Sequence, residues 1–187
     1  MAITIVATVG SASANSYVTE TEFQTYFEQR LNSAAVENAD SDRRQRAMVM
    51  AFRRLNLLGW IGNRVTTTQA GAWPRANARK PDDAGVSADS ELTLAATYAL
   101  TRGDYGIYSA PYPTYTTTEI PQRVKDAQCE LACAYLDGFD EHADRMTNVS
   151  QDGLSYQKQF ARPLNGLPGA VMRLLGPLLD GPRLVRG

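Results

Sequence analysis

Apolar residues recur at helical spacing in several parts of this 187-residue chain, and the pattern predicts a mainly α fold. Thr19 and Glu22 match a capping box that begins a helix running to about Leu31, with Phe23 and Phe27 on one side. A second amphipathic helix is expected to begin at residue 40 or 41 and to end at 58. Its apolar stripe comprises Ala47, Met48, Ala51, Leu55 and Leu58.

The most strongly apolar helix is expected after Glu119-Ile120-Pro121, where proline occupies the first turn, and it should end near Gly138. Apolar residues cover so much of its circumference that only a narrow polar strip remains. A helix of this kind belongs at the centre of a core or between subunits. Shorter helices are expected over residues 90–100 and 168–175.

Extended structure is expected at three places. Residues 3–9 are largely β-branched and should form a strand or an extended arm. Asp152-Gly153 lies between β-capable flanks in residues 146–160 and predicts a hairpin. Residues 180–187 are too short to fold alone, so they form either a docking arm or a frayed terminus. The expected fold class is a small helical bundle with a minor β-hairpin and extended N- and C-terminal arms.

The stretch from Leu55 to Arg75 holds both tryptophans of the chain. A tryptophan that precedes a proline, as in Trp73-Pro74, is pushed towards extended backbone, and its large ring requires a pocket. No residue type here suggests catalysis, so we interpret the stretch as a structural clasp. The members of this clasp are Trp60, Gln69, Trp73, Pro74 and Arg75.

The face of the second helix opposite its apolar stripe is basic and also carries two large apolar residues. Three interpretations are open: a solvated surface, a contact with an acidic protein neighbour, or a contact with nucleic-acid phosphates. The two apolar residues favour the first two interpretations, because they suggest a partly apolar interface. The candidate subunit interface comprises Arg43, Arg46, Met50, Arg53, Arg54 and Leu57.

The net charge is −1, whereas general nucleic-acid binders are usually basic overall. The charges are segregated, however, since residues 41–80 carry nine bases and one acid, and residues 81–145 carry four bases and twelve acids. Blocks of opposite sign suit a protein that meets copies of itself or charged partners in a fixed register. No segment reaches the roughly 20 apolar residues that a membrane span requires, so no membrane contact is expected.

The sequence holds no constellation typical of an enzyme, so no catalytic, cofactor or metal site is expected. His142 is the one histidine, and a metal site requires more ligands at set spacing. No Gly-x-Ser-x-Gly elbow and no phosphate-binding glycine loop with lysine occurs. Cys129 and Cys133 lie one helical turn apart, which excludes a disulfide scaffold and fits a reducing compartment.

Residues 76–118 have the composition of an insertion. After residue 100, four tyrosines of this region lie among glycine, serine, proline and threonine: Tyr105, Tyr108, Tyr112 and Tyr115. Tyrosines in such a loop stack on bases or bind proteins. No lysine or arginine lies between Asp104 and Glu119 to neutralise phosphates, so protein binding is favoured.

Short motifs in a fixed order carry a resemblance to a known family. The motifs are Ser13-Ala14-Asn15-Ser16-Tyr17-Val18, then Arg64, Gln69 and Ala72-Trp73-Pro74-Arg75, then Ile120-Pro121 with Val124, Ala127, Glu130 and Ala132, then Gly153 to Tyr156, and Leu-Leu-Gly-Pro-Leu-Leu at 174–179. In this order they resemble the head–tail connector (adaptor) family of tailed phages, often catalogued as DnaT-like single-stranded-DNA-binding proteins. Segment 76–118 departs from the pattern, since relatives pass from the WPR motif to the IP motif more directly.

The resemblance implies a non-enzymatic subunit of a homo-oligomeric, dodecameric ring in the neck of the virion, assembled in the host cytoplasm. The ring would bind the portal protein and a downstream neck or tail completion protein, and double-stranded DNA would pass through it without sequence-specific binding. The candidate portal-docking residues are Leu178, Leu179, Arg183, Leu184, Val185 and Arg186.

Two other functions stay open. The first is a single-stranded-DNA binder that uses the basic face of the second helix with Trp60 and the tyrosines. The second is a small tail-completion protein that acts as a monomer. In each case a single domain is expected over 1–187. Its parts are an N-terminal arm (1–18), helices and clasp (19–75), an inserted loop region (76–118), a central helix (119–145), and a hairpin, short helix and C-terminal arm (146–187).

Overall fold

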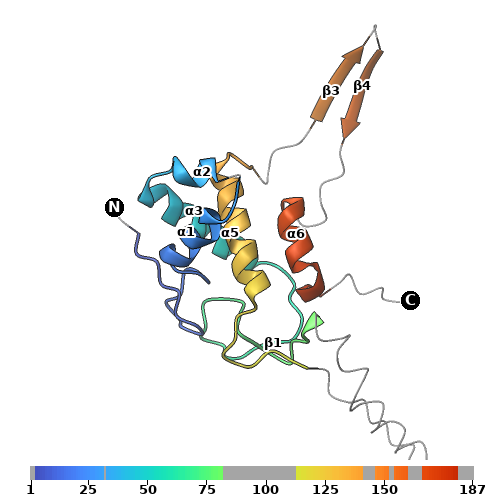
Figure 1. Cartoon of the computed structure of the whole chain (residues 1–187). Coiled ribbons are helices and arrows are strands. Elements are labelled where there is room, and N and C mark those ends of the chain that lie inside the picture. The colour runs from blue at the N-terminus through green and yellow to red at the C-terminus, as the bar shows by residue number, and fades with distance from the viewer. Residues whose placement is uncertain are drawn as a thin grey trace, which may run out of the picture.

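The computed structural model describes residues 3–31, 33–81, 113–140, 146–151, 154–159 and 166–180. These residues are mainly α with a minor β-hairpin, which confirms the expected fold class (Figure 1). The helices are α1 (Glu20–Glu28), α2 (Ala34–Glu37), α3 (Ser41–Leu55), α5 (Gln122–Leu136), α6 (Gly169–Leu175) and the 3-10 helix η2 (Gly176–Leu178). The helix predicted over 90–100 and the tyrosines at 105, 108 and 112 lie outside the described residues.

The first two long helices begin where the capping residues predict. At α1, the Thr19 side chain accepts a hydrogen bond from the Glu22 N–H, and the Thr19 N–H donates to the Glu22 carboxylate at 2.7 Å, so the predicted capping box is confirmed. Asp40 caps α3 by accepting from the Arg43 N–H at 2.7 Å. Both helices end three residues earlier than predicted, α1 at Glu28 and α3 at Leu55.

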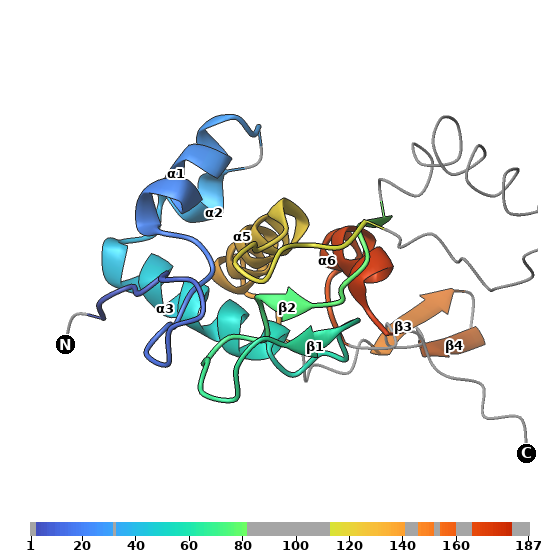
Figure 2. The same ribbon diagram turned by 90° about the horizontal axis from the view of Figure 1, so that it is seen from below.

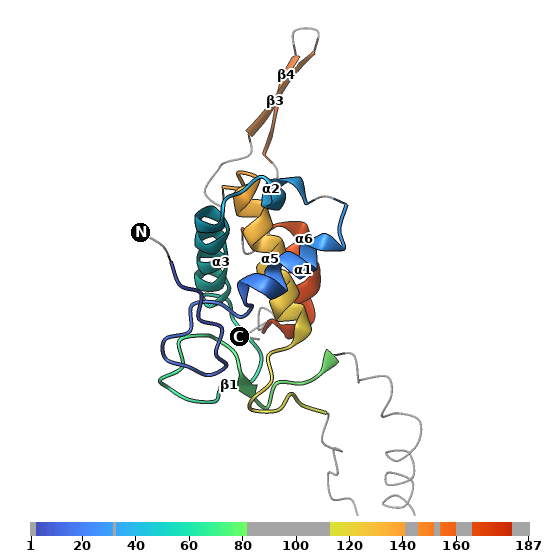
Figure 3. The same cartoon turned by 60° about the vertical axis from the view of Figure 1, so that its left-hand side comes forward.

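Helix α5 occupies the centre of the described bundle, as its apolar circumference predicts. It packs against α3 on one side and α6 on the other, with smaller contacts to α1 and α2. Figure 3 shows α3 at one edge of the bundle, next to α5. The core side chains of α5 include Val124, Ala127 and Leu131, all fully buried. One polar side chain, Gln128, is fully buried among them.

Two short antiparallel strands, β1 (Asn63–Arg64) and β2 (Arg75–Ala76), follow α3 and pair at the two ends of the segment between them. They lie side by side when the molecule is viewed from below (Figure 2). After β2, the Lys80 N–H donates to the Pro113 carbonyl at 2.9 Å and the Tyr115 N–H donates to the Ala78 carbonyl at 2.9 Å. The two ends of the inserted region 76–118 therefore leave and re-enter the fold side by side.

The N-terminal residues 3–9 form an extended arm that is paired by a side chain. The Asn15 carboxamide forms hydrogen bonds with the arm: it accepts from the Val6 N–H at 2.7 Å and donates to the Thr4 carbonyl at 2.8 Å. The Asn15 N–H adds a third bond, to the Val6 carbonyl at 2.9 Å. Of the two forms expected, strand or arm, the structure has the arm.

The predicted hairpin is confirmed. Strand β3 (Met146–Gln151) pairs antiparallel with β4 (Leu154–Gln159), and Gln151 lies opposite Leu154. This register places the turn at positions 152–153, where the Asp-Gly signal lies. In Figure 1 the hairpin extends away from the helices.

Among the described residues, no helix combines the length and apolar composition needed to cross a bilayer.

Candidate interaction surface

The predicted basic face of α3 lies at the surface of the molecule. Arg43, Arg46, Met50, Arg53 and Leu57 recur at intervals of three or four residues, and all five are exposed. We call these five residues the α3 stripe. Arg54, the sixth residue of the predicted interface, is only half-exposed and lies off this line. At 1.5 Å per residue, the part of the stripe within α3, from Arg43 to Arg53, extends over about 15 Å, and Leu57 follows just beyond the end of the helix.

Two residues of the α3 stripe are apolar: Met50 lies between Arg46 and Arg53, and Leu57 follows Arg53. Met50 is 51 % exposed and Leu57 is 76 % exposed, whereas the opposite face of α3 is buried, with Met48 and Leu55 fully enclosed. Arg46 has a weak partner in its own helix, since its guanidinium lies 3.6 Å from the Asp42 carboxylate. An exposed ion pair of this kind contributes little to stability, so it does not prevent Arg46 from binding elsewhere.

The clasp residues point inward and hold the fold. Trp60 and Trp73 are 6 % and 1 % exposed, and their rings meet edge to face with centroids 5.8 Å apart. The ring of Tyr115 also packs edge to face against Trp73, with a centroid distance of 5.6 Å. Both tryptophans are thus part of the core. The same burial means that neither tryptophan offers a free ring face for stacking on a base.

Two arginines of the clasp region bind backbone carbonyl groups. Arg75 donates to the carbonyl groups of Ile61 and Gly62 at 2.7 and 2.6 Å, and more weakly to those of Trp60 and Ala72. Arg64 donates to the carbonyl groups of Gln69 and Gly71. Burial lowers the pKa of Arg75, and the neighbouring Arg64 lowers it further. Both guanidinium groups are therefore engaged in shaping the 60–76 segment.

The carboxamide of Gln69 completes the clasp from inside. Its Nε2 donates to the carbonyl groups of Gly71 and Pro74 at 3.0 and 3.1 Å, and its Oε1 accepts from the Thr66 N–H at 3.0 Å. Gln69 is only 2 % exposed, so its buried carboxamide requires hydrogen-bond partners, and these three backbone groups supply them. This accounts for a glutamine at the centre of an apolar segment.

A second buried polar network lies between the N-terminal segment and the helices, and the sequence did not indicate it. The Tyr17 hydroxyl donates to Asn56 Oδ1, and the Ala72 N–H donates to both of these oxygens, at 2.8 and 2.7 Å. Gln128 accepts a hydrogen bond from the Tyr17 N–H and donates one to the Met48 carbonyl of α3. Neither Asn56 nor Gln128 lies in a pattern that distinguishes it from a surface amide, so their roles follow only from the fold.

Both cysteines lie on helix α5. Cys129 is buried, Cys133 is half-buried, and both are free thiols. Burial raises the pKa of Cys129 to about 12 and also raises the pKa of Cys133. A nucleophilic cysteine requires the opposite shift, since the thiolate is the reactive form.

The predicted portal-docking residues divide into two groups. Leu178 is fully buried in the core, and its carbonyl accepts from the Ile61 N–H at 3.1 Å. Leu179 forms a bridge with Trp60, and the Asp180 N–H donates to the Gly59 carbonyl at 2.8 Å. The prediction is wrong for Leu178, whose side chain is buried in its own chain and cannot contact a portal. Leu179 pairs with Trp60 through its backbone, and its side chain stays partly exposed. Arg183, Leu184, Val185 and Arg186 lie outside the described residues.

Comparison with known proteins gives one match. Residues 1–102 match the model of the family described as "Putative DnaT-like ssDNA binding protein". This match includes α1, α2, α3, the clasp and the α3 stripe, and it ends before α5. No curated protein and no solved structure matches the chain. The match covers more than half of the chain, so this protein belongs to the DnaT-like single-stranded-DNA-binding protein family.

Proposed function

We propose that this chain is a non-enzymatic structural subunit that binds neighbouring proteins, and that it serves in the head–tail connector of a tailed phage. The observation that carries the proposal is the α3 stripe, where the apolar side chains of Met50 and Leu57 are exposed alongside three arginines. Apolar side chains gain nothing from contact with phosphates. They gain free energy when a protein surface covers them, about 25 cal/mol per Å² buried.

The composition of the α3 stripe supports a protein partner. Arginine and methionine are enriched in protein interfaces, and apolar anchors surrounded by polar residues are the usual pattern of an interface centre. The ordered sequence motifs support the finer part of the proposal, which is a ring in the virion neck between portal and tail. In that setting, double-stranded DNA passes the ring without sequence-specific contacts.

Single-stranded-DNA binding is the second candidate function, and family membership favours it directly. Arg43, Arg46 and Arg53 could neutralise three phosphates along α3. Proteins that bind single strands usually add aromatic rings on which bases stack. The rings of Trp60, Trp73 and Tyr17 are buried. Tyr26, Tyr115 and Tyr135 are partly exposed, so base stacking in this candidate would rely on tyrosines and not on the tryptophans.

Two double variants of the full chain distinguish a protein partner from single-stranded DNA as the ligand of the α3 stripe. Arg43→Ser with Arg53→Ser removes two cations from the α3 stripe, and Met50→Ser with Leu57→Ser removes its apolar residues. Each variant and the wild type are titrated with a labelled single-stranded oligonucleotide at several salt concentrations, and with purified portal protein.

For a protein partner, the apolar variant loses portal binding and no variant shows salt-dependent DNA binding. For a DNA partner, wild-type affinity falls steeply with salt, and the arginine variant reduces the slope of log K against log salt by about 1.4. The apolar variant then binds DNA like the wild type. That second pattern would overturn the connector proposal.

A further inference from the structure

Arg64 and Arg75 lie directly opposite one another in the β1–β2 ladder, and we call them the arginine pair. Residues directly opposite in an antiparallel ladder have Cβ atoms about 5 Å apart on the same face. Both guanidinium groups also reach the same stretch of backbone, since Arg64 donates to the Gly71 carbonyl at 3.1 Å and Arg75 to the Ala72 carbonyl at 3.2 Å. Two positive charges are therefore held close together beside residues 71–72.

No carboxylate compensates the arginine pair within the described part of the chain, where neither guanidinium takes part in an ion pair. The local sequence explains this, because residues 43–81 include nine arginines and lysines and no Asp or Glu. Burial lowers the pKa of Arg75, and the charge of Arg64 lowers it further. Like charges directly opposite in a ladder are destabilising, so a bound anion would relieve their repulsion.

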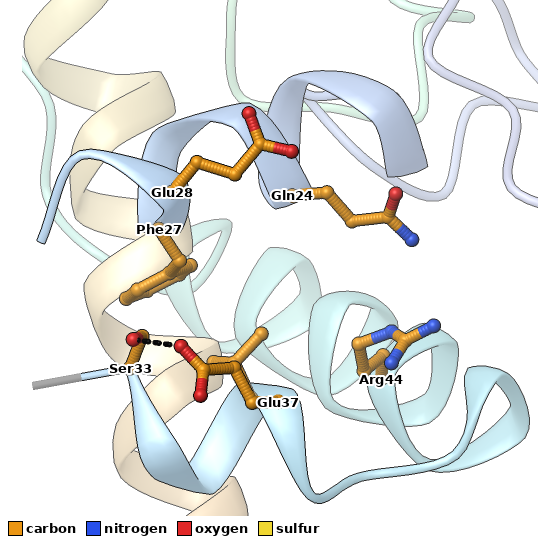
Figure 4. Close-up of a pocket in the computed structure, with 7 residues that line it drawn as sticks. Gln24, Phe27, Glu28, Ser33, Glu37 and Arg44 are labelled. Atoms are coloured by element: carbon orange, nitrogen blue, oxygen red, sulfur yellow. Dashed lines mark hydrogen bonds between the residues drawn. The ribbon is translucent and has the colours of Figure 1, made fainter.

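Arg44 illustrates the opposite arrangement, an arginine whose charge is compensated by its own chain. It lines a pocket of about 190 Å³ between α1 and α2, and the carboxylates of Glu28 and Glu37 line the same pocket (Figure 4). The Arg44 guanidinium also lies 3.8 Å from the Glu20 carboxylate. Arg44 therefore requires no external anion, whereas the hydrogen-bond partners of the arginine pair are neutral carbonyl groups.

The arginine pair still has hydrogen-bond donors to offer. Arg64 is exposed, and only its Nη2 is used in the bonds to the Gln69 and Gly71 carbonyls. The Nε and Nη1 groups carry the other three of its five N–H donors, and they make no bond to the described residues. Such a planar fork matches two oxygens of a phosphate-like anion. Arg75 is half-buried and donates to four carbonyl groups, so it contributes mainly charge.

We infer that the arginine pair binds a small free oxyanion of the phosphate or sulfate class. The Nε and Nη1 of Arg64 donate to two oxygens of the anion, and the neighbouring charge of Arg75 adds electrostatic attraction. The anion takes the place of the missing carboxylate, so its binding stabilises the clasp. This inference is independent of the α3 stripe and of the ligand that the stripe binds.

Titration of the full chain with sodium phosphate tests the inference, with sodium chloride at the same ionic strength as the control. Broadening of the phosphorus NMR signal measures binding, and thermal unfolding measures the accompanying stabilisation. Phosphate binding is expected to saturate, and the Tm is expected to rise with phosphate beyond the effect of chloride. Equal effects of the two salts would mean that only ionic screening acts, and the inference would be overturned.

Substitution of Arg64 locates the site. Arg64→Gln removes the charge and most of the fork, and it is expected to weaken phosphate binding at least about tenfold. Arg173→Gln, at an exposed arginine of α6, is the matched control and is expected to bind phosphate like the wild type. Wild-type affinity in a folded Arg64→Gln variant overturns the inference.

Arg64 also holds two carbonyl groups of the clasp, so a second measurement uses the wild type alone. The Nε–H resonance of Arg64 is expected to shift along the phosphate titration with the same affinity as the phosphorus signal. A resonance that stays in place up to saturation overturns the assignment, whether or not the variant folds.

A phosphate group can also belong to a nucleic-acid backbone, and a single-stranded oligonucleotide distinguishes this source from free phosphate. It is titrated at the same concentration of phosphate groups. Saturable binding of inorganic phosphate supports the free oxyanion. Binding of the oligonucleotide alone, lost in Arg64→Gln, would assign the arginine pair to a phosphodiester backbone and overturn the inference.

Discussion

Gln128 Oε1 accepts a hydrogen bond of 2.7 Å from the backbone N–H of Tyr17, although 111 residues separate the two in sequence. The Nε2 of the same side chain donates to the Ser16 hydroxyl at 2.8 Å and to the Met48 carbonyl at 3.0 Å. One fully buried amide thus joins α5, α3 and the segment before α1. Buried donors and acceptors must be paired, so this amide fixes how the three segments meet.

Replacement of Gln128 by leucine is expected to lower the free energy of unfolding by about 3 kcal/mol. Leucine has a similar volume but leaves the Tyr17 N–H, the Ser16 hydroxyl and the Met48 carbonyl without this partner in the core. Urea denaturation measures the change. Gln122→Leu, at an exposed position of the same helix, is the control and is expected to change stability by less than about 0.5 kcal/mol. Equal effects at both positions would contradict the role of Gln128.

Tyr17 predicts a pH dependence of stability. Burial raises the pKa of Tyr17 to about 12, from 10.0, because the phenolate is poorly solvated in the core. Below pH 10 the tyrosine is neutral in both states and its contribution is constant. Between pH 10 and about 12 the unfolded chain releases the proton first, so the free energy of unfolding falls, by about 2 to 3 kcal/mol in total.

Tyr17→Phe isolates this contribution. The variant loses the hydrogen bonds to Asn56, Ala72 and Trp73 and is expected to be less stable than the wild type by about 1 to 3 kcal/mol near pH 8. It also loses the titrating group, so the difference between the two proteins narrows as the pH rises above about 10. Denaturation at several pH values measures the gap. A gap that stays constant up to pH 11 would falsify the assignment.

Gly62 is predicted to tolerate no side chain. Its φ of +71° lies in the left-handed region, and a Cβ there would approach the Ala76 carbonyl oxygen to 2.5 Å and the Ala78 nitrogen to 2.8 Å. Both neighbours are backbone atoms, so Gly62→Ala is expected to destabilise by more than about 2 kcal/mol. Gly59→Ala is the matched control, since a Cβ at Gly59 meets nothing within 4 Å. Thermal unfolding of both variants compares them directly.

Arg75→Lys is expected to destabilise the clasp by about 1 to 3 kcal/mol although the charge is kept. The guanidinium plane reaches four carbonyl groups between Trp60 and Ala72, and a single ammonium group cannot reach all of them. Arg53→Lys, on the exposed α3 stripe, should leave stability unchanged. If both substitutions are silent in urea denaturation, the carbonyl contacts of Arg75 do not stabilise the fold.

The helices and the clasp could be predicted because their signals are local. Thr19 and Asp40 mark helix starts by the hydrogen bonds they make to residues three positions later. The exposed face of α3 follows from helical periodicity alone. The roles of Gln128, Asn56 and Asn15 could not be predicted, because an amide that pairs distant backbone groups has the same local pattern as one in solvent. The prediction that Leu178 docks on a portal was wrong for a related reason. An apolar stripe after a helix break does not indicate whether the stripe packs on its own chain or on another protein.

The bonds from Leu178 and Asp180 to the 59–61 segment have a consequence for synthesis. A nascent chain leaves the ribosome from its N-terminus, so Trp60 emerges long before the residues that seal it. Until residues 178–180 have been synthesised, the 59–61 segment lacks these hydrogen bonds. A prematurely terminated product would lack them permanently. A chain that ends before residue 178 would therefore lack the backbone contacts that cover Trp60.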